Sequence, residues 1–502
     1  MDNKLVSFLI KKAKAIILSY RSHIIRYTFH FLTNEQIRST LLNQLSKKII
    51  DQLTRSETFK GRIFSPHFAV ITGTSRIVNL ENNLEQINLF LNTENNLRRP
   101  VIKLNPQEKK RILFVTAIFP STRHAGGLRV FDIIQTLSKN YKISLYSSFN
   151  PSHDTESFDL LKDKLEFVRL VNHSFFSDKD LRTWLGGVKT NFLLSYHVWP
   201  ESSTLLFSSR RHSKISIFEH SEVVTRSYFL ELEKIASDTR AYDFRNLAYF
   251  FTLSYIAEYI ACNLADVSLC LTAADELFVK ETFNKKDTYL MPTCISRHAV
   301  LDKINSYRPE DDPSNTTAIF LGYYDHTPNV AAVEWFISKA LDKVLIQVPN
   351  FKLKVVGKGN LENLKSTYSS PSIEWVGEVE DIVPHIQSAT ICLSPLISGA
   401  GFRGKINQYS ACKKATVSTS IGVCGLPYTN KKDVLIADTS EDFATQVVLL
   451  LKNNTLRKEI EENAFKLVNE HYSWDRTITS FESFLNTYEN SMDLVTAIQP
   501  QI

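Results

Sequence analysis

Short runs of apolar residues alternate with amphipathic helical patterns along most of this chain. In the first half, apolar runs predict buried β-strands at residues 111–116, 141–147, 215–218, 266–272 and 288–292. Helical spacing of apolar residues predicts helices at residues 128–137, 227–264 and 274–282. A strand, a glycine loop, a helix and a second strand form a βαβ unit, so we expect a parallel sheet covered by helices.

The same alternation starts again after residue 296. Apolar runs predict strands at residues 318–322, 351–356, 373–376, 390–393 and 415–419. Helical patterns follow at residues 330–345, 382–386, 406–412, 441–451, 456–471 and 478–488. We therefore predict an α/β protein with two Rossmann-like, doubly wound domains that face a cleft. Ligands of such sheets bind beyond the carboxyl ends of the strands.

The pattern divides the chain into four segments. We predict a helical and irregular N-terminal extension at residues 1–106 and an N-terminal Rossmann-like domain at residues 107–295. A C-terminal Rossmann-like domain follows at residues 296–475, and a C-terminal helix and tail at residues 476–502.

The extension begins with an uneven charge pattern. Residues 1–34 carry six Lys and Arg residues against Asp2 alone, with apolar residues between them. Our first interpretation is a helix that packs on its own protein or on a partner chain. The second is a basic amphipathic helix in peripheral contact with an anionic membrane.

Composition narrows the function classes. The 502 residues are 43% hydrophobic and 22% charged, which is typical of a globular protein, and no run is long and apolar enough to span a bilayer. We predict a cytoplasmic protein, peripheral at the inner face of the membrane in the second interpretation above. The six cysteines show neither a C-x-x-C pair nor zinc-ligand spacing, so we expect free thiols and no metal. The net charge of +6 suits small anions and does not require nucleic acid.

The richest segment for chemistry is residues 395–409, Pro-Leu-Ile-Ser-Gly-Ala-Gly-Phe-Arg-Gly-Lys-Ile-Asn-Gln-Tyr. It follows a predicted buried strand and opens a predicted helix. Glycines let the backbone approach a ligand closely, and the start of a helix presents free N–H groups and a positive dipole end. Arg403 and Lys405 add two charges there, so the segment predicts a diphosphate site. The alternative is an ordinary loop with two solvated cations.

With this segment the chain resembles family 4 of the retaining glycosyltransferases, glycosyl transferases group 1, over residues 320–474. The resemblance is carried by Leu-Gly-Tyr-Tyr-Asp-His-Thr-Pro-Asn (residues 321–329), Val-Gly-Glu-Val-Glu-Asp (376–381), the glycine-rich segment and Glu-His-Tyr-Ser-Trp-Asp (470–475). It is weaker over residues 111–292. The resemblance implies a GT-B fold in which residues 107–295 form the acceptor-side domain and residues 296–475 bind the nucleotide sugar. It also implies transfer of a sugar from a UDP- or GDP-linked donor, with no metal and no separate cofactor. The implied role is glycan or polysaccharide biosynthesis.

The resemblance also implies roles for particular residues. The donor diphosphate and nucleotide would be bound by Gly126, Gly127, Gly399, Ala400, Gly401, Phe402, Arg403, Lys405 and Gln408. Two of these positions depart from the family's Glu-x7-Glu motif, because Ala400 replaces the first glutamate and Gln408 the second. An amide can still hydrogen-bond a hydroxyl, whereas Ala400 offers only its backbone.

The remaining candidates contact the transferred sugar or the acceptor. His220 follows a predicted strand, and the resemblance implies an active-site role for it; with Arg403 and Lys405 it completes our predicted catalytic residues. Glu222, Arg226, Gly322, Asp325 and His326 are candidates for donor or acceptor contacts. A structural histidine and solvated surface residues are the alternatives. Asp178-Lys-Asp180, the one acidic pair considered for a metal, is expected in a polar surface loop.

Two other function classes stay open. The missing carboxylates fit a nucleotide-sugar-binding protein of this fold with weak or no catalysis. Another GT-B enzyme, a sugar epimerase or a phosphorylase, is the third interpretation. In the first interpretation the donor would be a nucleotide sugar, and the acceptor would be a glycan or a lipid-linked glycan.

Overall fold

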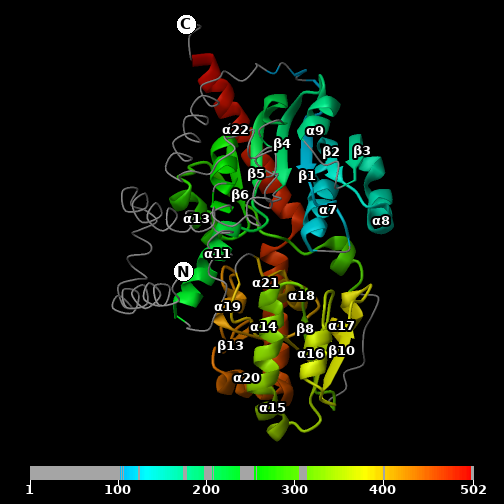
Figure 1. Ribbon diagram of the computed structural model, residues 1–502, viewed down its shortest axis with the longest axis vertical. Helices are drawn as coiled ribbons and strands as arrows, with labels where there is room; N and C mark the ends of the chain where they lie inside the picture. Colours follow the sequence, from blue (N-terminus) through cyan, green and yellow to red (C-terminus); the bar gives the residue numbers. More distant parts are fainter. Residues whose placement is uncertain are drawn as a thin grey trace, which may run out of the picture. The chain divides into compact units, whose positions relative to one another are not determined.

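The computed structural model describes residues 107–122, 125–172, 178–196, 209–237, 257–304, 314–399 and 402–498, with single residues between these ranges. The predicted N-terminal extension therefore lies outside the described residues, apart from residues 102, 104 and 105. Within the described part, no helix has both the length and the apolar character that a membrane crossing needs. Two parallel sheets form the framework, and helices cover them (Figure 1).

The first sheet has seven strands in the order β3-β2-β1-β4-β5-β6-β7. Their bounds are β1 Arg111–Thr116, β2 Lys142–Ser148, β3 Leu165–Val171, β4 Thr190–Tyr196, β5 Ser213–Glu219, β6 Val267–Cys270 and β7 Thr288–Leu290. The helices along this part of the chain are α7 Ala125–Leu137, α8 Pro151–Leu161, α9 Asp178–Leu185, α11 Val224–Ser237 and α13 Ala273–Thr282. The order reverses between β1 and β4, so the sheet is doubly wound as predicted.

Five of these strands were predicted, and two were missed. β1 has the predicted bounds. All but its first residue are buried, as expected for a strand covered by helices on both faces. β4 is also buried throughout, but only Phe192, Leu193 and Leu194 in it are strongly apolar. β3 was missed because Glu166 and Arg169 interrupt its apolar residues, and it is half exposed, as is common at the edge of a sheet.

The second sheet has six strands in the order β10-β9-β8-β11-β12-β13. Their bounds are β8 Thr317–Leu321, β9 Lys352–Val356, β10 Ile373–Gly377, β11 Ile391–Ser394, β12 Thr416–Ser418 and β13 Leu435–Ile436. The associated helices are α14 Thr327–Trp335, α15 Leu341–Gln347, α16 Glu362–Thr367, α17 Ile382–Ser388, α18 Gly404–Ala411, α19 Ser420–Val423, α20 Ser440–Lys452, α21 Asn454–His471 and α22 Trp474–Ile498.

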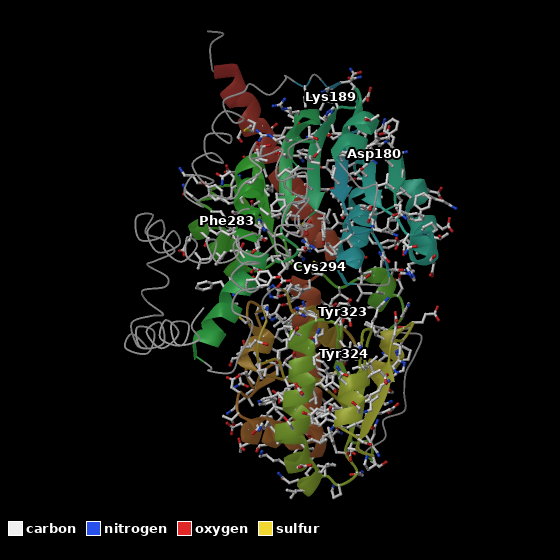
Figure 2. All side chains as sticks on the ribbon, viewed as in Figure 1. Asp180, Lys189, Phe283, Cys294, Tyr323 and Tyr324 are labelled. Carbon is white, nitrogen blue, oxygen red and sulfur yellow. The ribbon has the colours of Figure 1, made fainter. Side chains whose placement is uncertain are left out.

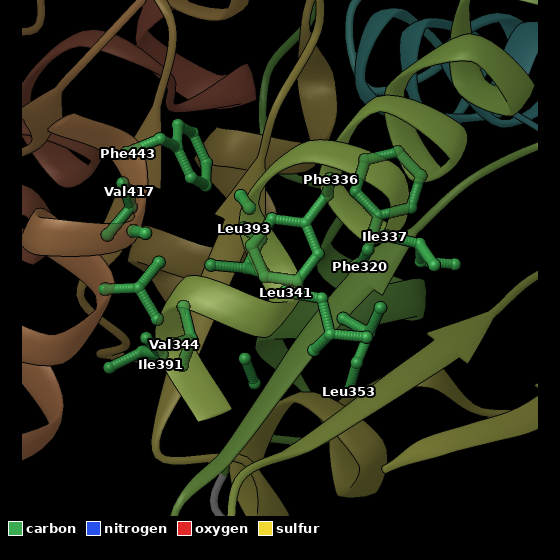
Figure 3. Packing of buried hydrophobic residues seen from close by; sticks show 14 of the residues in the cluster. Phe320, Phe336, Ile337, Leu341, Val344, Leu353, Ile391, Leu393, Val417 and Phe443 are labelled. Carbon is green, nitrogen blue, oxygen red and sulfur yellow. The ribbon is translucent and has the colours of Figure 1, made fainter. Parts of the chain in front are cut away.

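An apolar core joins this second sheet to its helices. Three phenylalanines are nearly or fully buried in one cluster: Phe320 from β8, Phe336 from the π-helical segment Phe336–Ala340 after α14, and Phe443 from α20 (Figure 3). The rings of Phe336 and Phe443 lie 5.9 Å apart in an edge-to-face arrangement. This packing fixes β8 and α14, which carry the loop described below.

Residue contacts divide the described chain into two compact units that interleave along the sequence. The first holds the described residues up to 117 together with 144–148 and 168–290, and the second holds 118–143, 149–167 and the residues from 291 onward. The predicted domain boundaries remain a prediction. Within the second unit, α7 is tied to the start of α22, since Trp474 Nε1 donates a hydrogen bond to Asp132 Oδ2 at 3.1 Å.

Candidate functional site

The candidate site lies in the second unit, where the strand order reverses between β8 and β11. These strands pair in parallel, with Ile391 opposite Ala318 and Cys392 opposite Ile319. Their carboxyl ends therefore lie side by side, but their chains leave in opposite directions, to β9 and to β12. Such a reversal leaves a crevice between the two loops, which is where ligands of open α/β sheets bind.

Hydrogen bonds to the end of β9 and to the loop after it fix the loop after β8. Gly322 N–H donates to Val356 O at 3.0 Å, and Tyr324 N–H donates to Lys358 O at 2.7 Å. A side chain on Gly357, where φ is +136°, would come within 1.8 Å of Gly322 O, so the two loops touch at their backbones. Figure 2 labels Tyr323 and Tyr324 at this end of β8; Tyr324 is buried, whereas Tyr323 is half exposed.

Asp325 and His326 occupy the exposed crest of this loop. Asp325 Oδ1 accepts a hydrogen bond from Asn360 N–H at 3.0 Å, which anchors the crest to the turn after β9. His326 is the N-cap residue of α14 and makes no side-chain cap hydrogen bond. Both side chains are exposed to solvent, so this loop can present them to a ligand.

The glycine-rich segment after β11 approaches the same helix. Gly399 has φ of +108°, and a Cβ there would lie 3.2 Å from Pro328 Cβ in the first turn of α14. Arg403 is largely buried and donates from Nη2 to Gly399 O at 2.6 Å, so it closes the segment on itself. Arg403 is also the N-cap residue of α18, which places its charge at the positive end of that helix.

Lys405 lies in the first turn of α18 and reaches across to β8 and α14. Its Nζ donates to Asn329 Oδ1 at 2.7 Å and lies 4.1 Å from the centroid of the Phe320 ring. Burial, and then the charge of Arg403, lower the pKa of Lys405 to about 7. Two neighbouring cations in a partly desolvated site repel each other until an anion binds between them. Such an arrangement is typical of an anion-binding site.

Two of these contacts were not predicted from the sequence. Asn329 accepts from Lys405 and donates from Nδ2 to Tyr323 O at 3.0 Å, so its amide joins both loops. Phe320 was predicted only as a strand residue, yet its ring also faces the ammonium group of Lys405. The only signal was Asn329 at the start of a predicted helix, and no pattern links it to Lys405, which is 76 residues away.

The other donor-site candidates are partly placed. Gln408 is half-buried, three residues after Lys405 on α18, so both side chains lie on one side of that helix. Phe402 is half-buried, and its ring packs 5.8 Å from that of Tyr472. Ala400 and Gly401 lie outside the described residues.

Gly126 and Gly127 lie in the first turn of α7 rather than in a loop before it. The predicted helix began at Leu128, but α7 begins at Ala125. The prediction of a glycine loop was therefore wrong at this point, because glycine lowers helix propensity without preventing helix in a first turn. A Cβ on Gly126 would meet only Ile118 Cδ1, at 3.6 Å.

In the first unit, His220 follows β5 and is fully buried. Its Nε2 lies 3.4 Å from Cys262 Sγ, and its Nδ1 lies 3.8 Å from Glu258 Oε1. Burial lowers the pKa of His220, but Cys262 and Glu258 outweigh this and raise it to about 10. The ring exposes no surface within this structure, so an active-site role for it stays a prediction.

Glu222 and Arg226 lie beyond the same strand and are half-buried. Glu222 accepts a hydrogen bond from the Ser227 hydroxyl, and Arg226 forms a 2.9 Å ion pair with Asp275. Each is therefore held by a neighbour at the carboxyl end of the sheet. Their proposed contact with an acceptor is not tested by these contacts.

The acidic pair considered for a metal lies elsewhere and was misplaced. Residues 178–180 form the first turn of α9 rather than a polar loop, and Asp180 pairs with Arg169 at 2.6 Å. This ion pair joins β3 to α9, and β3 itself was missed. Among the residues that the structure describes, no group of three or more His, Cys, Asp and Glu side chains is arranged to hold a metal ion.

Comparison with known proteins bears on this site. Residues 315–453 match the family of glycosyl transferases group 1. The match spans β8 to the end of α20 and so contains both loops of the candidate site. It confirms the group 1 resemblance at this level, whereas the retaining family 4 assignment stays a prediction.

Two relatives share sequence with this chain. An uncharacterized glycosyltransferase of Methanocaldococcus jannaschii is 24% identical over 409 residues, which cover 76% of this chain and 99% of that protein. An uncharacterized 44.6 kDa protein in the cps region of Klebsiella pneumoniae is 27% identical over 177 residues, or 34% of this chain. The chain spans only 46% of the length of that second relative.

The fold is similar to that of solved structures. Anabaena HepE, solved in complex with UDP and glucose, has a TM-score of 0.55 at 12% sequence identity, and the alignment covers 75% of this chain and 99% of that one. The fold is thus the predicted α/β GT-B class with two Rossmann-like domains.

Proposed function

We propose that this protein is a glycosyltransferase that moves a sugar from a nucleoside-diphosphate donor to a hydroxyl group of an acceptor. One observation carries the proposal: Arg403 and Lys405 meet at the strand-order reversal of the second sheet, beside the start of α18. The group 1 family match over residues 315–453 supports the same assignment. HepE, a structural neighbour, has been solved with UDP and glucose, which supports a UDP-linked donor; GDP is the alternative.

The chemistry follows from the charges at this site. As the bond between the sugar and the diphosphate breaks, negative charge develops on the leaving phosphate. Arg403, Lys405 and the positive end of α18 would stabilise this charge. Phe402, Gln408 and the backbone of Gly399 to Gly401 would hold the nucleotide, as the family resemblance implies, and no metal or separate cofactor is part of the proposal.

The finer assignments belong to the same proposal. We propose retention of anomeric configuration, with the acceptor proton passing to an oxygen of the leaving phosphate. Gly126 and Gly127 would lie near the donor diphosphate, and His220 near the transferred sugar. Glu222 and Arg226 would lie near the acceptor, and Gly322, Asp325 and His326 would contact the donor or the acceptor. We expect a glycan or lipid-linked acceptor, a role in polysaccharide biosynthesis and a cytoplasmic location, with residues 1–34 at the inner face of the membrane.

The experiment is calorimetric titration of the full-length chain with UDP-glucose, GDP-mannose and related nucleotide sugars, followed by product analysis. We expect Arg403→Ala to weaken binding and lower turnover by roughly tenfold or more, since a hydrogen bond to a charged group contributes ~1.5–3 kcal/mol. Lys466→Ala, an exposed residue of α21, is the matched control and should behave like the wild type. Unchanged binding and transfer by Arg403→Ala would refute the site.

The alternative is a nucleotide-sugar-binding protein with weak or no catalysis. It is favoured by the loss of both motif carboxylates, at Ala400 and Gln408. Binding of a nucleotide sugar with neither transfer nor donor hydrolysis would establish this alternative. Anomeric NMR of any product would decide between retention and inversion.

A further inference from the structure

Positively charged residues gather at one edge of the first sheet, where its strands begin. β1, β4 and β5 are parallel neighbours, with Ile112 opposite Phe192 and Phe192 opposite Ile215. The residues that precede these strands therefore meet at one edge. This edge is opposite to the carboxyl ends that carry His220 and Glu222, so the proposed transfer reaction does not account for its charge.

We define the basic edge by its six cations: Lys109, Lys110, Arg111, Lys189, Arg211 and Lys214. They precede or open the three strands, and Figure 2 labels Lys189 at the start of β4. Neighbouring strands are ~4.8 Å apart, so three strands span ~10 Å, about one Debye length in physiological salt. The six charges therefore act as one field on a large anion.

Contacts hold two of these side chains, those of Arg111 and Lys110, against the sheet. Arg111 Nη1 donates to Lys189 O at 3.4 Å, and Lys110 Nζ lies 5.9 Å from the centroid of the Phe192 ring. Carboxylates in the neighbouring sequence are fewer. Asp266 is engaged by Ser216, through the backbone N–H at 2.7 Å and the hydroxyl at 2.8 Å. Glu108 is the acidic residue beside the first three cations, so cations exceed carboxylates here.

Two observations indicate which polyanion fits. None of the exposed large hydrophobic or aromatic side chains in the described chain belongs to residues 107–112, 188–191 or 209–215. Proteins that bind single-stranded nucleic acid combine cations with exposed aromatic residues that stack on bases, and this edge lacks them. Moreover, the segment that leads into β1 begins with residues 1–34, in which cations alternate with apolar residues, a pattern that suits a bilayer interface.

We propose that the basic edge of the first sheet is a docking surface for a bilayer rich in anionic phospholipid. It binds the headgroups electrostatically, without inserting side chains into the acyl region, and it adds to the membrane contact proposed for residues 1–34. The proposal does not depend on the donor site, because the basic edge and Arg403 lie in different units.

The test is partition of the full-length protein onto vesicles of phosphatidylcholine with 30% phosphatidylglycerol, and onto phosphatidylcholine alone. The variant replaces Lys109, Lys189, Arg211 and Lys214 by glutamine. Neutralising a cation near an anionic membrane weakens binding roughly fivefold, so four changes should lower the partition coefficient at least tenfold. A control with the same change in net charge replaces the exposed Lys339, Lys432, Lys452 and Lys466 by glutamine and should stay within twofold of the wild type.

Circular dichroism and nucleotide-sugar titration show whether the edge variant is folded; if it is not, the pairs Lys109/Lys189 and Arg211/Lys214 are changed separately. The proposal is supported if only the edge variants lose partition onto anionic vesicles, and if this loss becomes smaller in high salt. Three results would overturn the proposal: wild-type partition of the edge variants, an equal loss in the control, or tighter binding of the wild type to a DNA duplex than to anionic vesicles. Loss of nucleotide-sugar binding in Arg403→Ala would leave all these outcomes unchanged.

Discussion

Donor affinity should depend on pH through one lysine. Lys405 is half-buried, with its ammonium group against the Phe320 ring. Desolvation by burial, and then the charge of Arg403, lower its pKa to about 7 in the empty site. A bound diphosphate removes the electrostatic penalty and raises this pKa again. Binding therefore takes up a proton whenever the pH lies above 7.

The lowered pKa of Lys405 determines how many protons are taken up on binding and how the dissociation constant changes with pH. At pH 8, about one tenth of free Lys405 carries a proton, so binding should take up about 0.9 proton per site. The dissociation constant should be nearly constant below pH 7 and should rise by up to tenfold per pH unit above it. The slope ends where the pH passes the pKa of Lys405 in the complex.

The assay is calorimetric titration with a nucleotide sugar between pH 6 and 8.5, in buffers of different ionisation enthalpy. A nucleotide sugar is chosen because both ends of its diphosphate are esterified, so the diphosphate does not titrate in this range, and the upper limit stays below the ionisation of the uracil or guanine ring. Lys405→Arg keeps its charge and should bind with little pH dependence. Lys405→Met should bind ~10- to 100-fold more weakly at pH 7, since it loses a charged hydrogen bond, and should also lack the slope.

A flat affinity profile in the wild type would refute the reasoning, as would an equal slope in Lys405→Arg. The first result would mean that Lys405 is charged in the empty site. The second would assign the titration to another group. Neither result would by itself remove the diphosphate site, which Arg403→Ala tests separately.

Three further predictions concern the second unit. Gly399→Ala should lower the free energy of unfolding by about 1–3 kcal/mol, because φ at Gly399 is +108° and Pro328 is close. Gly404→Ala should not lower it, because a Cβ there would have no contact nearer than 3.7 Å. Chemical denaturation measures both variants, and equal losses of stability would contradict the strain argument. Asn329→Leu removes the acceptor of Lys405 and should weaken nucleotide-sugar binding severalfold in calorimetry, while the exposed Asn363→Leu should not; equal affinity of the two variants would count against the contact. Burial raises the pKa of Asp132 to about 7, above its value in the unfolded chain. The protonated side chain therefore adds stability that is lost as the pH rises through 7. In thermal unfolding between pH 5 and 8, Asp132→Asn should remove this part of the pH dependence of stability, and an unchanged dependence would refute the prediction.

Local patterns in the sequence determined much of the fold. β1, β8 and β11 were predicted within one residue of their observed bounds, because short apolar runs between turn residues leave few alternatives. The glycine-rich segment and its two cations were also found this way, since a strand, a flexible turn and a helix start are all local features. The edge strand β3 was not predicted because two charged residues, Glu166 and Arg169, interrupt its apolar residues. β4 was not predicted because its apolar run is short, and its burial depends on the neighbouring strands rather than on its own composition.

Tertiary structure alone decided which of these features meet. Strand order brings the loop after β8 beside the loop after β11, and only this pairing lets Asn329 accept from Lys405 across 76 residues of sequence. Burial of the ammonium group, and with it the lowered pKa of Lys405, follows from that approach. Likewise, the cations before β1, β4 and β5 become one basic edge only because these strands are parallel neighbours. Sequence determines the residues and their local conformation, whereas distances between remote residues depend on how the strands pair.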